Sequence, residues 1–284
     1  MTPSRFTHFA AIDWSGAKGR RHRGIAIAAC EAGNAAPALV EPQHIWSRCE
    51  VLDWVRARAA GPGRWLIGFD FSFAPASIGR GAYLPGEDVP ADARAFWAYV
   101  DSCCEDEDLG AASFLEQRHR PHFYFGAADG RKADFMHFRQ CELAFNAGGG
   151  GKPSTVYDAI GASQVAKASF SGMRLLHRVG DALPVWPFDP LDPQRSAIVE
   201  IYCRACIRLG GARGMKLRTS AELNAVLAGL GSAPVADQPL SDHQTDVLAT
   251  AAGMRAIAAD PRYWRPRGLT PEIARTEGWT FGID

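Results

Sequence analysis

The sequence has no excess of charge of either sign. Its 284 residues contain 31 lysines and arginines and 31 aspartates and glutamates, so the formal net charge is zero. A protein that coats nucleic acid is usually basic, and any contact with nucleic acid must therefore come from local patches of charge. The composition, with 47% hydrophobic residues, is enough for one large domain or for a domain that carries a big insertion.

Long apolar runs and a regular cysteine pattern are also missing. No run approaches the roughly 18 apolar residues that a membrane span needs, and the N-terminal MTPSRFTHF lacks the apolar core of a signal peptide. The seven cysteines are odd in number, irregularly spaced and mostly inside apolar segments. We therefore expect a reduced, cytoplasmic chain with no membrane partner and no disulfide scaffold, and the sequence leaves its oligomeric state open.

Apolar runs and turn signals predict a mixture of strands and helices. Two helices have the spacing of a capping box at their start: Ser47 and Glu50 precede a helix over 50–60, and Ser241 and Gln244 open one over 242–259. The predicted strands cover residues 6–14, 24–30, 64–73 and 196–207, and residues 44–48 could form another.

Residues 74 to about 195 differ in character from the rest of the chain. They contain loops rich in glycine and proline, the run NAGGGG, and helical stretches at 91–104, 134–145 and 163–179. We interpret this segment as an insertion packed over one end of the sheet.

Three carboxylates stand alone among apolar neighbours in the strongest predicted strands. They are Asp13, Asp70 and Glu200. Burying an unpaired carboxylate costs several kcal/mol or shifts its pKa until it is neutral. Because side chains alternate along a strand, each aspartate shares its face with a small residue two positions earlier, Ala11 and Gly68, which leaves room for something to approach.

A fourth carboxylate, Asp246, lies one turn into the last predicted helix. It is on the same face as Asp242 and within reach of His243. Carboxylates that converge raise one another's pKa, and a divalent cation relieves the repulsion; an all-oxygen ligand set favours Mg²⁺ or Mn²⁺ over zinc. A single aspartate at a strand end is more often a turn-former, and the helix dipole is enough to explain Asp242, but the three residues Asp13, Asp70 and Asp246 together favour a shared metal site. Asp242 is a further candidate ligand of that site.

The order of these elements is that of the ribonuclease H-like fold. The stretches AIDWSGAK, IGFDFSFAPA, VEIYCRA, SDHQTDVLATAAGMR and EGWTFGI resemble the predicted nucleases of domain-of-unknown-function family 429. The resemblance runs from residue 8 to near the end and is weakest in the insertion, where only QVAKASFSGMRLLHRV matches. One departure is Cys203, where the family has proline, and we expect it to affect the turn and not the metal.

The resemblance implies an α/β fold with a mixed five-stranded sheet flanked by helices. It implies a single domain over 1–284, with the insertion at about 74–195 between the fourth and fifth strands. It also implies, by superfamily analogy, a hydrolase that cleaves the phosphodiester of a nucleic acid or nucleotide. Two Mg²⁺ or Mn²⁺ ions roughly 3.5–4 Å apart would be bridged by Asp13 and flanked by Asp70 and Asp246, with Glu200 or His243 beside the attacking water.

Two basic segments are candidates for substrate contact. Lys18, Arg20 and Arg21 lie in KGRRHR, close to the Asp13 strand, and Arg118 and Arg120 lie in RHRPHFYF, where aromatic residues are interleaved. Phosphate contacts from these cations and bases stacked on the aromatic rings would suit a single strand or a flexible end. Each segment could equally be a solvated turn.

Other motifs are incomplete. NAGGGGKP fails the phosphate-loop pattern at both ends and indicates a hinge or a loop in close backbone contact. Cys203 and Cys206 fall on opposite sides of a predicted strand, and Cys103-Cys104 with His119-x-x-His122 has no familiar zinc spacing. An actin-like small-molecule kinase would need a second copy of the first strand pattern, which is absent. A non-catalytic nucleic-acid-binding protein on the same fold remains the other alternative.

Overall fold

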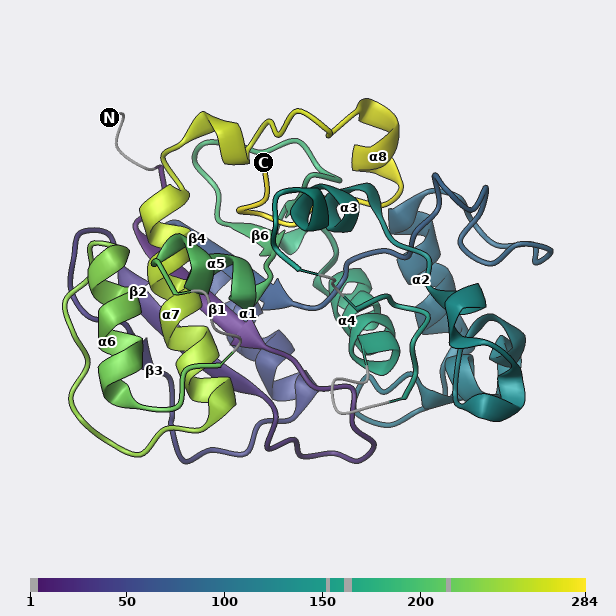
Figure 1. Ribbon diagram of the computed structural model, residues 1–284, viewed down its shortest axis with the longest axis horizontal. Helices are drawn as coiled ribbons and strands as arrows, with labels where there is room; N and C mark the ends of the chain where they lie inside the picture. Colours follow the sequence, from purple (N-terminus) through teal and green to yellow (C-terminus); the bar gives the residue numbers. More distant parts are fainter. Residues whose placement is uncertain (1–4, 152–153, 161–164, 213–215) are drawn as a thin grey trace.

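A mixed sheet of six strands, flanked by helices, organises the part of the chain that the structure describes. The computed structural model describes residues 5–151, 154–160, 165–212 and 216–284. The strand order is β3-β2-β1-β4-β6-β5; β1, β2 and β3 are antiparallel neighbours, whereas β4, β6 and β5 continue the sheet parallel to β1 (Figure 1). The strands are β1 (His8–Asp13), β2 (Ala26–Glu31), β3 (Ala38–Leu39), β4 (Trp65–Asp70), β5 (Val185–Trp186) and β6 (Ala197–Glu200).

Helices cover both faces of this sheet. The α-helices are α1 (Arg48–Ala60), α2 (Ala93–Cys103), α3 (Gln140–Ala147), α4 (Val165–Val179), α5 (Cys203–Leu209), α6 (Ser220–Gly229), α7 (Asp242–Ile257) and α8 (Pro271–Arg275). Shorter helical turns are η1 (Phe114–Arg118), η2 (Arg120–His122), η3 (Ala127–Asp129), η4 (Lys132–Phe135), η5 (Gly180–Ala182) and η6 (Pro261–Tyr263). None of the helices described is long and apolar enough to cross a membrane.

The two faces of the sheet bury two separate hydrophobic cores. Ala10 and Ile12 of β1 pack with α1, α2 and α4, whereas Phe9 and Ala11 pack with α5, α6 and α7. Strands buried on both faces need apolar residues at every position, which is why the strand segments read as continuous apolar runs.

Both predicted capping boxes are confirmed. The Ser47 hydroxyl accepts from the Glu50 amide at 3.1 Å, and the Glu50 carboxylate accepts from the Ser47 amide at 2.8 Å. Ser241 and Gln244 repeat the arrangement at 3.3 and 2.9 Å, so α7 starts where the sequence predicts. The start of α7 matters most, because it fixes which residues face the sheet.

The prediction of five strands is wrong in two places. Residues 44–48 form no strand, because His44 to Ser47 lead directly into the N-cap of α1, and the third strand is Ala38–Leu39 instead. A sixth strand, β5, comes from within the segment interpreted as the insertion and pairs with β6. A two-residue strand carries no periodic signal that the sequence could reveal.

The predicted strand over 196–207 is also wrong beyond Glu200. The chain turns there, and Cys203 becomes the first residue of helix α5, which packs against α7. Cys203 and Cys206 are therefore one helical turn apart and not on opposite sides of a strand. An apolar run of this length suits a buried helix as well as a strand, and pattern alone does not separate the two.

The insertion lies beside the sheet, beyond the carboxyl ends of β1 and β4 (Figure 1). Its helix α4 touches the chain directly after both strands: the indole of Trp14 donates to Ser171 Oγ at 2.9 Å, and the Phe71 ring lies against Gly172. Residues that follow the two strand aspartates are thus held by the insertion, and this end of the sheet is covered.

Gly68 allows α7 and the chain after β6 to approach β4 closely. A Cβ atom at this position would lie 2.6 Å from Ile201 Cγ2 and 2.8 Å from Met254 Sδ. We expect Gly68→Ala to lower the free energy of unfolding by about 1–3 kcal/mol through overpacking. Gly79→Ala is the matched control, because no described atom lies within 4 Å of the added methyl group. Equal urea denaturation midpoints for the two variants would contradict this packing.

Candidate functional site

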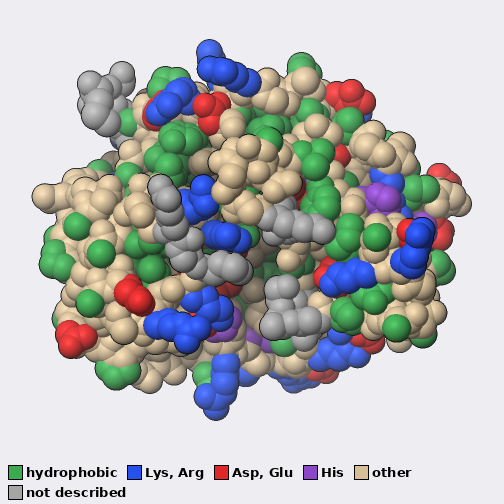
Figure 2. Space-filling model, in the orientation of Figure 1, with side chains coloured by type: hydrophobic (Ala, Val, Ile, Leu, Met, Phe, Trp, Pro, Cys, Tyr) green, Lys and Arg blue, Asp and Glu red, His purple; other side chains and the backbone are tan. Residues whose placement is uncertain are grey.

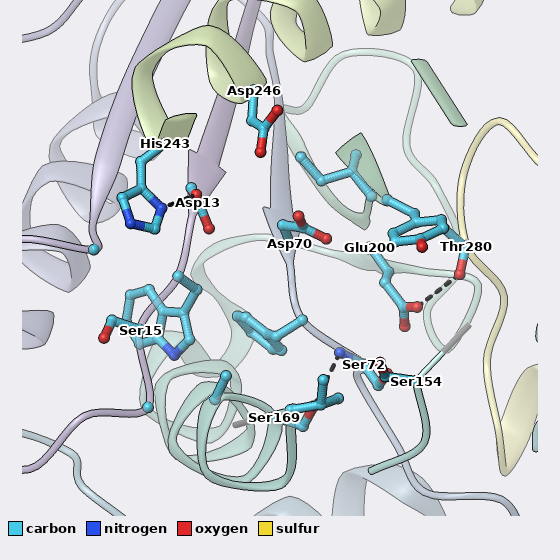
Figure 3. Close-up of a pocket in the computed structure, with 18 of the residues that line it drawn as sticks. Asp13, Ser15, Asp70, Ser72, Ser154, Ser169, Glu200, His243, Asp246 and Thr280 are labelled. Carbon is cyan, nitrogen blue, oxygen red and sulfur yellow. Dashed lines mark hydrogen bonds and ion pairs between the residues drawn. The ribbon is translucent and has the colours of Figure 1, made fainter. Parts of the chain in front are cut away.

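Two aspartates end neighbouring parallel strands at the same level. Asp13 of β1 and Asp70 of β4 are paired in the register of the sheet. Both strands end there, and α7, which packs across β1 and β2, adds Asp246 from its second turn. Figure 3 shows the three carboxylates around one space. The predicted grouping of Asp13, Asp70 and Asp246 at one edge of the sheet is thus present.

The three carboxylates repel one another electrostatically. Burial, followed by the charge of Asp13, raises the pKa of Asp70 to about 8. The same two causes raise the pKa of Asp246 to about 7, although the nearby His243 charge opposes the rise. Keeping these three carboxylates charged therefore requires a compensating cation, which the described residues supply only in part.

Cys203 contacts one of the three aspartates as well as lying at the predicted turn. Its side chain hydrogen-bonds to Asp70, which partly offsets the rise in the pKa of that carboxyl. One signal of this contact was visible in the sequence, the cysteine in place of an expected proline. The contact itself depends on α5 starting at this residue, which the strand prediction missed.

His243 and Asp13 form a hydrogen-bonded pair. His243 Nδ1 lies 2.7 Å from Asp13 Oδ2, and this contact is the main reason that the pKa of His243 is raised. The imidazole side chain remains 48% exposed and lines the cleft described below.

Asp242 is part of the cleft wall but has a partner of its own. Its carboxylate pairs with Lys216, which lowers its pKa, and its side chain is 48% exposed. The predicted role as a metal ligand is therefore less well supported than that of Asp246, because the protein already supplies a cation to Asp242.

Glu200 is the centre of a buried hydrogen-bond network. The Arg139 guanidinium donates to both of its oxygens, at 2.7 and 2.5 Å, and the Phe73 amide and Thr280 hydroxyl add bonds at 2.8 and 2.7 Å. Arg139 also donates to Glu142 Oε1 at 3.0 Å. The predicted role of Glu200 beside an attacking water is not supported, since four donors already occupy its oxygens. Glu200 instead joins β6, the insertion and the C-terminal segment.

A cleft of about 640 Å³ opens onto the aspartates. The ends of β1, β4 and β6 and the start of α7 form one side, and residues of the insertion form the other, among them Phe145 and Ser169. Figure 2 shows a hollow in this face with lysine and arginine side chains around it. Its size is that of a small-molecule or nucleotide site.

The cations predicted to contact substrate are not among the described residues that line this cleft. Lys18 pairs with Glu116 at 2.8 Å, Arg20 with Glu107 at 2.6 Å, and Arg21 with Glu50. Arg120 pairs with Asp129 at 2.6 Å, and Arg118 lies over the Tyr99 ring. Surface carboxylates that are distant in sequence compensate most of these charges, which the local pattern could not reveal.

The donor set of the three aspartates suits a hard divalent cation. All of the donors are carboxylate oxygens, and the raised pKa values of Asp70 and Asp246 reflect burial first and then the negative charge of Asp13. Within the described ranges, no group of three or more His, Cys, Asp or Glu side chains is arranged to hold a metal ion as it stands. The three aspartates therefore suit a divalent cation in their donor atoms and in their position. Binding of the ion would require their side chains to move closer together.

The chain matches no model of a known protein family, no curated protein and no solved structure. Its function is therefore inferred from the cleft and from the sequence.

Removing the Glu200 carboxylate tests the buried network. Glu200→Ala leaves the Arg139 guanidinium buried without its main partner, and we expect a loss of about 3–5 kcal/mol in the free energy of unfolding by urea denaturation. Asp134→Ala, which removes an exposed pair with Arg131, is the control and should change stability little. A loss for Glu200→Ala as small as that of the control would show that the network is not the connection described.

The metal-free protein should lose stability as the pH rises from about 5 to about 8. Asp70 and Asp246 keep their protons in the folded state up to a pKa of about 8 and about 7, whereas the unfolded chain releases them near pH 4. The folded state therefore binds more protons over this range, and the free energy of unfolding falls as they are lost.

Asp70→Asn removes the larger of these two contributions. In the presence of EDTA, the variant should show a shallower dependence of the urea midpoint on pH and should be more stable than the wild type at pH 8. A wild-type midpoint that rises with pH over this range, or an unchanged slope in the variant, would contradict the electrostatic description of the site.

Proposed function

We propose that this chain is a divalent-metal-dependent nuclease or phosphodiesterase on a ribonuclease H-like fold. The observation that carries the proposal is the pairing of Asp13 with Asp70 at the ends of two parallel strands, with Asp246 above them on α7. The element order that underlies the sequence resemblance supports the fold: a strand with Asp, antiparallel strands, a helix, a strand with Asp, the insertion, a strand and a helix with Asp.

Asp13, Asp70 and Asp246 would hold Mg²⁺ or Mn²⁺, and the sequence resemblance implies two ions. When bound, such ions activate water for attack on a phosphodiester and stabilise the charge that develops on the leaving oxygen. The chain contributes position: the register of β1 and β4 fixes two ligands, and the capping box at Ser241 fixes the third by fixing the start of α7.

His243 is the residue best placed to move a proton. Asp13 holds Nδ1 of the imidazole at 2.7 Å and so sets the orientation of the ring. Because the side chain borders the cleft, its other nitrogen can give a proton to, or take one from, a group bound there. In the metal-free protein, the hydrogen bond that His243 donates to Asp13 raises the pKa of the imidazole.

Cleavage of a labelled single-stranded oligonucleotide tests the proposal. We expect activity with Mn²⁺ or Mg²⁺ that EDTA abolishes, and a fall of about 100-fold or more in Asp13→Asn, because this variant removes a ligand oxygen and the partner of His243. Asp53→Asn, on the exposed side of α1, is the control and should keep wild-type activity. Activity that persists in EDTA, or in a folded Asp13→Asn protein, would refute the proposal; a folded wild type that binds but never cleaves would support the non-catalytic alternative.

A further inference from the structure

An aromatic pair lines the cleft close to the aspartates. Phe145 of α3 and Tyr202, which follows β6, meet edge to face with ring centroids 5.3 Å apart. Both side chains are partly exposed, and the Phe145 ring also packs against Gly150. Aromatic faces of this kind stack nucleic-acid bases without regard to sequence. The sequence analysis placed base stacking in residues 118–125, whereas the cleft is lined by this other pair.

Arg204 lies next to this pair and has no carboxylate partner among the described residues. Its side chain is hydrogen-bonded to that of Tyr202, and its Nε is buried with no hydrogen-bond partner in the described part of the chain. In contrast, Arg139 and Arg174, which are more deeply buried, each pair with a carboxylate. Arg204 does not itself line the cleft, but its guanidinium has no carboxylate partner among the described residues and contacts Tyr202, which does, so it is a candidate partner for a phosphate group.

The glycine run packs against Arg204 and Phe145. A Cβ atom at Gly151 would lie 3.0 Å from Nη2 and 3.2 Å from Nη1 of Arg204, so a side chain there would crowd the guanidinium. Gly149 and Gly151 also have positive φ angles of 75° and 88°, which favour glycine. The predicted close-contact role of NAGGGG is thus seen, and its contact is with Arg204.

The far side of the cleft is closed by the insertion. The backbone of Gly16, just beyond Asp13, lies directly against α4, where an added Cβ atom would be 2.2 Å from the Ala168 amide nitrogen. The aspartates line a cleft of about 640 Å³. A space of this size suits one or two nucleotides of a flexible strand better than a rigid duplex.

We propose that this cleft takes single-stranded nucleic acid, with a phosphate on Arg204 against the Gly148–Gly151 loop and a base against Phe145 and Tyr202. This inference rests on the proposed function, because it names the substrate class of the same site. Arg204 and Phe145 position the strand, and the aspartates carry the chemistry.

Fluorescence anisotropy with a labelled single-stranded oligonucleotide, in Ca²⁺ and with the probe checked for intactness, tests the inference. Arg204→Gln should weaken binding about tenfold and reduce the slope of log K against log salt by about 0.7, the value for one phosphate contact with a single strand. Phe145→Leu keeps an apolar side chain but loses the aromatic face, and should weaken binding about tenfold with the salt slope unchanged. Arg262→Gln, at an exposed arginine, is the control and should change neither quantity.

Two outcomes overturn the inference. One is a wild type that binds a duplex of the same sequence as tightly as the strand, or binds neither. The other is a pair of folded Arg204→Gln and Phe145→Leu variants that bind like the wild type. Cleavage in Mn²⁺ is measured separately. If the wild type binds the strand and the two variants bind it more weakly as predicted, but no cleavage occurs, only the proposed function is refuted. If the wild type cleaves and both variants bind like the wild type, only this inference is refuted.

Discussion

The parallel pairing of β1 with β4 is the constraint on which the candidate site depends. It sets Asp13 directly opposite Asp70, and two like charges at neighbouring strand ends are costly to bury. Among the described residues, His243 pairs with Asp13, and Lys216 and His243 offset only part of the rise in the pKa of Asp246. The chain adds this third carboxylate, Asp246, on the helix that covers the same face. An arrangement that raises the pKa of two aspartates has a physical reason if a divalent cation is bound there in the working protein.

Other carboxylates in the same cleft differ from the three aspartates, because each of them pairs with a lysine or an arginine. Glu200 and Glu142 are buried but share the guanidinium of Arg139, and Asp242 pairs with Lys216. These carboxylates are compensated by the chain itself and serve its structure. The network around Glu200 also fastens the insertion and the C-terminal segment to the end of β6, so that the cleft has two walls. The paired carboxylates of the cleft thus stabilise the fold, whereas the three aspartates are proposed to bind the cation.

Local signals predicted part of this arrangement. The capping boxes located α1 and α7, and the two-residue period placed Asp13 on the face of Ala11, which α7 covers. Features that depend on contacts between residues far apart in the sequence could not be predicted. The pairing of Lys18 and Arg20 with glutamates roughly 90 residues away, the two-residue strand β5, and the change from strand to helix after Glu200 each depend on tertiary contacts. The contact of Cys203 with Asp70 depends on that last change.

The central claim is that Asp13, Asp70 and Asp246 together hold a divalent cation, and anomalous scattering tests it most directly. Crystals of the wild type and of Asp13→Asn grown with Mn²⁺ would be compared in anomalous difference maps. The account predicts density between the three carboxylates in the wild type that is lost in the variant. A well-ordered wild-type site with no such density at millimolar Mn²⁺, and with the carboxylates turned apart, would contradict it.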